Sequence, residues 1–153
     1  MNEITESVAR FLEAQGFVIV STLDADSFPH SSCKGMLKVE GNRVFLIDCY
    51  RGETRKNLLA DARMSVTAVD EGNYRGYCLK GRGRVVEGAD ISAPCLERWR
   101  DRKTGRTTSR VIRNIRAQQT TGRHPEAAFP EPKHLIVLEV EEVVDLARFS
   151  QKP

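Results

Sequence analysis

Residues 43–63 read RVFLIDCYRGETRKNLLADAR, and they join a strand pattern to a helix pattern. The apolar run 44–47 is typical of a buried strand, whereas the segment from Gly52 onward is typical of a short helix. A hydroxyl, two cations and an amide open that helix: Thr54, Arg55, Lys56 and Asn57. Because the first backbone N–H groups of a helix have no internal partners and carry partial positive charge, this pattern predicts a phosphate site. The alternative is that Thr54 is only an N-cap and that both cations are solvated.

Composition limits the class of protein. The chain has 153 residues, 40% of them hydrophobic and 29% charged, which is typical of a single soluble domain over 1–153. No apolar run is long enough to cross a bilayer, and the amino terminus lacks the pattern of a signal peptide, so we expect a cytoplasmic protein. The four cysteines are widely spaced with no Cys-x-x-Cys, so we expect no metal site and reduced thiols buried in strands.

Positive charge is concentrated late in the chain. The formal net charge is only +3, but Asp101 is the only acidic residue between Arg98 and Arg123, a segment rich in arginine. Such a block is usually a solvated face, and it can also bind a polyanion such as a nucleic acid. Because no nucleic-acid motif accompanies the charge and Trp99 is the only aromatic residue within the block, nucleic-acid binding is the least favoured alternative.

Periodicity predicts a mostly β (β+α) protein, a six-stranded antiparallel barrel with attached helices. The expected strands cover 17–23, 30–39, 43–49, 64–69, 74–86 and 134–144. The expected helices cover 4–15, a short segment after the second hairpin, and a helical excursion over 92–124 that contains helices at 92–103 and 108–118. Gly76, Gly81 and Gly83 lie inside one expected strand, where glycines usually mark a bend, a bulge or a close approach.

The side chains alone do not supply a reaction. The chain has no Gly-x-Gly-x-x-Gly after a strand, no Ser-His-Asp or Cys-His arrangement and no paired carboxylates in a catalytic spacing, and its three histidines lie in unrelated settings. No catalytic residue can therefore be named. A bound cofactor would supply the chemistry.

Five segments in order resemble a known family. They are 17–22 (FVIVST), 28–32 (FPHSS), 43–48 (RVFLID), 54–58 (TRKNL) and 79–85 (LKGRGRV). This order resembles the pyridoxamine 5'-phosphate oxidase-related family of FMN-binding split barrels. The resemblance covers about residues 4–90, and the closing strand is consistent with it.

The resemblance implies a homodimer with two FMN molecules bound between its subunits. Beside the isoalloxazine ring it places the segment Ser32, Cys33, Lys34 and Gly35, with Ile47 and Asp48 near the same ring. Around the FMN phosphate it places Thr54, Arg55 and Lys56, supported by Asn57. It also places Lys80 and Arg82 on a strand near the dimer interface, although both could simply be exposed. Lys34 is the candidate cation beside the pyrimidine end of the flavin; the alternative is a lysine that points into water from an edge strand.

The chain also departs from the true oxidases. It lacks their Arg-x-His pair and their distinctive C-terminal segment, and Gly76 stands where they place a glutamine. We therefore expect an FMN-dependent oxidoreductase that exchanges hydride with an unidentified small molecule, and not a true pyridoxamine phosphate oxidase. The arginine block could attract an anionic substrate. Two alternatives remain: a sensor or store that binds flavin or haem without turnover, and a polyanion-binding protein.

Overall fold

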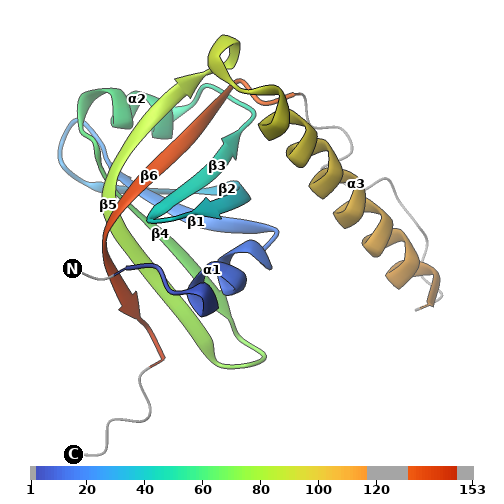
Figure 1. The fold of residues 1–153 in the computed structure, drawn as a ribbon. Helices are drawn as coiled ribbons and strands as arrows, with labels where there is room; N and C mark the ends of the chain where they lie inside the picture. The colour runs from blue at the N-terminus through green and yellow to red at the C-terminus, as the bar shows by residue number, and fades with distance from the viewer. Residues whose placement is uncertain (1–2, 117–130, 148–153) are drawn as a thin grey trace, which may run out of the picture.

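The computed structural model describes residues 3–116 and 131–147, which form a barrel with attached helices (Figure 1). The strands are β1 (Phe17–Leu23), β2 (Pro29–Glu40), β3 (Arg43–Asp48), β4 (Arg63–Asp70), β5 (Arg75–Glu87) and β6 (His134–Asp145). The helices are α1 (Glu6–Glu13), α2 (Glu53–Ala60) and α3 (Ala93–Arg116), and a 3-10 turn, η1 (Gly88–Asp90), precedes α3.

The barrel is closed and antiparallel, as predicted. Its strand order is β1-β2-β3-β6-β5-β4, and pairing between β1 and β4 closes the ring. The last strand of the chain, β6, inserts between β3 and β5. Since a closed barrel has no edge strand, every strand of this ring has a neighbour on both sides. The barrel thereby brings the end of β3 beside the start of β6.

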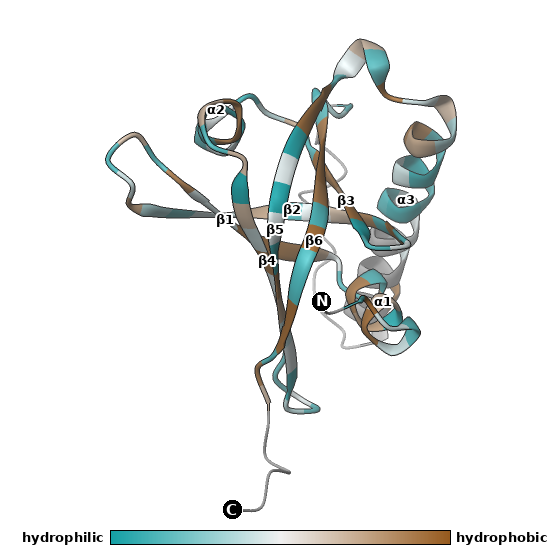
Figure 2. Ribbon diagram, turned by 60° about the vertical axis from the view of Figure 1, so that its left-hand side comes forward, coloured by the Kyte–Doolittle hydropathy of each residue, from teal (hydrophilic) through white to brown (hydrophobic). Residues whose placement is uncertain are grey.

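Alternation along the strands builds the main core. On β1, Val18 and Val20 are buried, whereas Phe17 and Ile19 face outward. Figure 2 shows the same alternation as brown and teal bands along β5 and β6. Helix α1 adds Phe11 and Leu12 to this core. Inward side chains of strands and helix therefore share one apolar interior.

A bulge in β2 creates a second apolar cluster outside the barrel. The β2–β3 register shifts between Met36 and Lys38, which leaves Leu37 as the extra residue. Leu37 is fully buried, and it belongs to a cluster that includes Trp99 and Cys95 of α3. A β-bulge re-aims a side chain in this way. The bulge thus provides the surface on which α3 packs.

The prediction of two helices in the excursion is wrong. A single helix, α3, runs from Ala93 to Arg116 and passes through Gly105. Nothing lies within 4 Å of the position that a Gly105 side chain would take, so this glycine is in open space. A glycine in an exposed helix costs only about 1 kcal/mol relative to alanine, which is not enough to break it. The predicted segment 117–124 lies outside the described residues.

Several arginines of the basic block serve the fold. Arg98 donates from Nε to the Leu37 carbonyl at 3.0 Å, next to the bulge. Arg102 donates to the carbonyls of Glu13 and Gln15 at the end of α1 (2.8 and 3.0 Å). Cations are favoured at the carboxyl end of a helix, where carbonyls have no internal partner. These two arginines attach α3 to the barrel and to α1, so they offer little support for polyanion binding.

The cysteines are all free, and their predicted placement is partly wrong. Cys33 is exposed on β2, and Cys95 is buried on α3 rather than on a strand. The exposed site of Cys33 follows from the period of β2, in which residues 29, 31 and 33 face outward.

Gly81 allows the backbones of β5 and β6 to approach closely, as its position inside a strand predicts. The β5–β6 register shifts between Lys80 and Gly81, and a Cβ at Gly81 would lie 1.9 Å from the carbonyl oxygen of Glu139.

We expect Gly81→Ala to lower the free energy of unfolding by about 3 kcal/mol, measured by denaturant titration, because the strands must separate. Gly72→Ala is the control, since its Cβ would meet only the Asp70 carboxylate at 3.5 Å. Equal stability of the two variants would contradict this account.

Candidate functional site

Two hydrogen bonds between side chains fix α2 to the barrel. The hydroxyls of Ser32 on β2 and Thr54 on α2 lie 2.6 Å apart, and Asn57 donates from Nδ2 to the Thr22 hydroxyl on β1 at 3.1 Å. Thr22, Thr54 and Asn57 are buried. Buried polar groups require partners, and these pairs provide them. Thr54 and Asn57 therefore hold the helix in place.

The amino end of α2 is open. Its N-cap is Gly52, so the alternative in which Thr54 is the N-cap is wrong, and no side chain caps the helix. Nothing lies within 4 Å of the position that a Gly52 side chain would take. The first intrahelical bond runs from the Lys56 N–H to the Gly52 carbonyl at 3.3 Å. The N–H groups of the first turn can therefore donate hydrogen bonds to an anion.

Three cations, Arg51, Arg55 and Lys56, lie in or next to the first turn of α2, together with the acid Glu53. Arg55 donates from Nε to Glu87 Oε1 at 3.2 Å, and its Nη2 contacts the same oxygen. Arg51 Nη2 lies 3.7 Å from Glu87 Oε2, and Lys56 is exposed. Hydrogen bonding from Arg55 lowers the pKa of Glu87. Glu87 is thus an ionised acid that holds Arg55 beside the helix end.

A second group of charges lies inside the same end of the barrel. Asp48 Oδ2 lies 3.0 Å from Lys34 Nζ and 3.0 Å from His134 Nε2. Both distances are those of ion pairs, although the angles fall outside hydrogen-bond geometry. Burial alone raises the pKa of Asp48, but contact with His134 and the Lys34 ammonium lowers it more, so its net pKa lies below the usual range. Asp48 is therefore a carboxylate between two nitrogen groups.

Lys34 is not a solvated edge lysine, because β2 has neighbours on both sides and this side chain turns inward to Asp48. Only 13% of the Lys34 side chain is exposed. The sequence pattern did not indicate a role for His134, which is fully buried. Asp48 and His134 face each other across the β3–β6 pairing. Only the order of the strands in the barrel brings these two residues together, so the spacing of residues along the chain could not have indicated their contact.

The structure brings together half of the predicted site residues at the α2 end of the barrel. These are Ser32, Lys34, Asp48, Thr54, Arg55 and Asn57, with Lys56 exposed on the same helix.

The other predicted residues lie elsewhere. The Ile47 side chain packs in the cluster beneath α3, Gly35 pairs with Ile47 across the sheet, and Cys33 faces outward. Lys80 and Arg82 are exposed on β5, where they pair with Glu142 and Glu141 of β6 at 3.2 and 3.4 Å. They do not contact the group at the α2 end.

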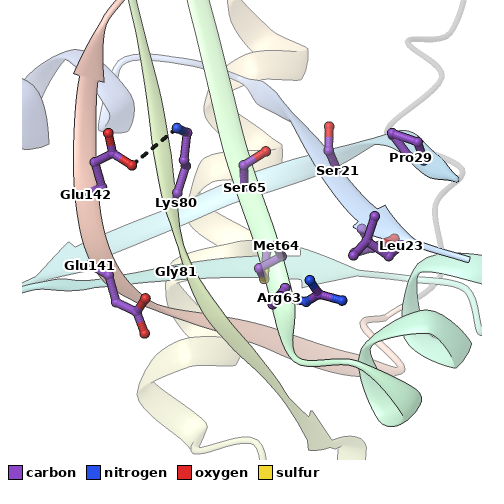
Figure 3. Close-up of a pocket in the computed structure, with 11 residues that line it drawn as sticks. Ser21, Leu23, Pro29, Arg63, Met64, Ser65, Lys80, Gly81, Glu141 and Glu142 are labelled. Atoms are coloured by element: carbon purple, nitrogen blue, oxygen red, sulfur yellow. Dashed lines mark ion pairs between the residues drawn. The ribbon is translucent and has the colours of Figure 1, made fainter. Parts of the chain in front are cut away.

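A cavity of about 430 Å³ is lined by β1, β4, β5 and β6, with Pro29 at the start of β2 (Figure 3). Ser21 and Ser65 project from neighbouring strands, and Lys80 points to Glu142. Leu23, Pro29 and Met64 supply apolar walls. Small-molecule sites commonly have this size and mixture of surfaces. Of the predicted site residues, only Lys80 lines this cavity.

Within the described part of the chain, no three His, Cys, Asp or Glu side chains are grouped to hold a metal ion. No helix there is long and apolar enough to span a membrane.

Comparison with known proteins identifies the family. The model of the pyridoxamine 5'-phosphate oxidase family matches residues 4–147, so the chain belongs to this family. No curated protein matches the sequence.

Solved structures share the fold at low sequence identity. HupZ of Group A Streptococcus is 16% identical with a TM-score of 0.64, over 95% of both chains. A Clostridium acetobutylicum protein of the pyridoxinephosphate oxidase family, related to general stress protein 26, is 12% identical with a TM-score of 0.58, over 91% of this chain and 84% of that one. An F420 reductase is 15% identical with a TM-score of 0.57, over 92% and 98%. At these identities the likeness concerns the fold alone.

The buried pair of Lys34 and Asp48 makes stability depend on pH. Because the folded-state pKa of Asp48 lies below its ordinary value of 3.8, the carboxylate stabilises the fold above that pH. This stabilisation is lost as the pH falls through the folded-state pKa. We expect Asp48→Asn to lower the free energy of unfolding by about 3 kcal/mol at pH 7, because it leaves Lys34 without a counter-ion.

Denaturant titrations at pH 7 and pH 3 measure the free energy of unfolding of both proteins. The difference between the wild-type protein and Asp48→Asn should be smaller at pH 3 than at pH 7. A difference of the same size at both pH values would contradict an ionised Asp48 in the fold.

Proposed function

We propose that this protein binds FMN at the α2 end of the barrel and uses it to exchange hydride with a small molecule. The observation that carries the proposal is the uncapped amino end of α2, with Arg55 held beside it by Glu87 and with Lys34 buried nearby. Family membership supports a flavin as the ligand.

The open amino end of α2 would bind the phosphate of FMN. Its oxygens would accept hydrogen bonds from the first-turn N–H groups of α2, whose partial positive charge favours an anion. Lys56 is exposed and can turn to a phosphate, and Arg55 has a nitrogen, Nη1, that makes no contact with Glu87. Charge-assisted hydrogen bonds of this kind are the strong ones. Ser32 and Thr54 would support this site by holding the helix.

The flavin ring suits the neighbouring strand surface. Lys34 is the partly exposed member of the buried charge group, and it would place a positive charge at the edge of the ring. When bound, FMN supplies hydride transfer at its N5 atom. The protein contributes a cation at a fixed position and walls that exclude water.

We also propose that two copies of the chain associate through the outer patch, defined as Phe17, Ile19, Thr67 and Val69 on β1 and β4. Phe17, Ile19 and Val69 are 63, 42 and 61% exposed, and Ile19 pairs with Thr67 across the two strands. Contiguous exposed apolar side chains on a sheet face are typical of an interaction surface. The same outward face continues to Ser21 and Ser65, which line the cavity, so a second copy on the patch would also cover the cavity.

The phosphate site is tested by FMN titration with flavin fluorescence. We expect Arg55→Ala and Lys56→Ala each to weaken FMN binding about tenfold or more, because each removes a charge-assisted contact. Arg10→Ala is the matched control, since this exposed arginine pairs with Glu6 on α1. Unchanged FMN affinity in both site variants would contradict the proposal.

Turnover is a separate outcome. The FMN-loaded protein should show flavin absorption bands that bleach anaerobically with NADH or NADPH. A yellow protein whose bound flavin is reduced by neither NADH nor NADPH would favour a sensor or a store of flavin.

The proposed dimer is tested by sedimentation. We expect Ile19→Asp to convert a dimer into a monomer, because a charge would have to be buried without a partner. Ile112→Asp is the control, since Ile112 is exposed on α3 at 45% and is not part of the outer patch. A wild-type monomer, or an Ile19→Asp dimer, would contradict the assignment of this face.

A further inference from the structure

We propose that Asp48 and His134 are positioning residues, which hold the Lys34 ammonium at the flavin edge and so set the redox potential of bound FMN. This inference rests on the proposed function and assigns a role to His134, which the sequence did not indicate. The three residues come from β2, β3 and β6.

One carboxylate oxygen receives both nitrogen groups. Lys34 Nζ and His134 Nε2 each lie 3.0 Å from Asp48 Oδ2. Pairing between β3 and β6 places His134 directly opposite Asp48. The imidazole therefore contacts the same oxygen that contacts the lysine.

Burial separates the roles of the three side chains. Asp48 is 3% exposed and His134 is 0% exposed, whereas Lys34 keeps 13% of its side chain exposed. Of the three, Lys34 is therefore the side chain that a ligand can reach. An ionised carboxylate in the interior is costly unless it is paired, so Asp48 holds the Lys34 side chain close to it. Asp48 and His134 would thus act on a ligand through Lys34.

The wider surroundings place His134 between two acids. It pairs across the sheet with Asp48 on β3 and with Glu87 on β5. Glu87 is engaged by Arg55 of α2 and lies near Arg51, so its charge is already compensated. Neither ring nitrogen of His134 has a partner in hydrogen-bond geometry within the described residues, and Nε2 lies 3.0 Å from Asp48 Oδ2. The contact with Asp48 is therefore the polar contact that orients the imidazole.

The midpoint potential of FMN-loaded protein distinguishes positioning from a merely structural role. A cation at the ring edge favours the reduced flavin, so Lys34→Met should lower the potential. We expect a shift on the order of 30 mV, which is a tenfold change in the equilibrium constant of a two-electron couple. His134→Leu should shift the potential in the same direction. His134→Gln, which keeps an N–H donor for Asp48, should stay near the wild-type value.

Asp61→Asn is the matched control, because Asp61 forms an exposed ion pair with Arg63 beyond the other end of α2. It should leave the potential unchanged. If Lys34→Met shifts the midpoint potential of bound FMN but His134→Leu leaves it at the wild-type value, the inference is overturned.

A second measurement needs no flavin. In the unloaded protein, Lys34→Met, His134→Leu and the double variant form a thermodynamic cycle on the free energy of unfolding. We expect the effects of the two substitutions on the free energy of unfolding to be non-additive, because both side chains contact the same oxygen of Asp48. Additive effects would overturn the inference whether or not FMN binds. If the wild-type protein does not bind FMN while the cycle is non-additive, the proposed function fails and the arrangement of Lys34 stands.

Discussion

The hydrogen bonds that join α2 to β1 and β2 are the constraint on which the candidate site depends. Ser32 with Thr54, and Thr22 with Asn57, satisfy polar groups that would otherwise be buried without partners. Leu58 of the same helix enters the main core. Apolar packing alone would leave the rotation of a short helix poorly defined, whereas two directional contacts fix it. The open amino end of α2 therefore has a defined place at the mouth of the barrel.

Charges at this end of the barrel are costly to bury, and their arrangement offsets much of that cost. Asp48 is paired on two sides, and Glu87 is paired with Arg55. A buried ion pair is often no more stabilising than an apolar replacement, so its presence in a core indicates a task other than stability. Under the proposed function, Asp48 and Glu87 would hold Lys34 and Arg55 in place before a ligand arrives, which would reduce the loss of side-chain freedom on binding.

The sequence predicted the architecture well because strand alternation and glycine placement are local signals. The register shift at Gly81 follows from such a signal. The continuous helix α3 was missed because an exposed glycine penalises a helix too weakly to end it. Contacts such as Arg55 with Glu87 and Asp48 with His134 join segments far apart in the chain. The contact of Asp48 with His134 depends on the insertion of β6 beside β3, which residue spacing does not encode.

Binding of a flavin phosphate at the amino end of α2 can be measured by calorimetric titration with FMN and with riboflavin, which differ only in that phosphate. We expect FMN to bind at least tenfold more tightly than riboflavin, and this preference to disappear when Arg55 and Lys56 are both replaced by alanine. Equal affinity of the wild-type protein for the two flavins would contradict phosphate binding at this site.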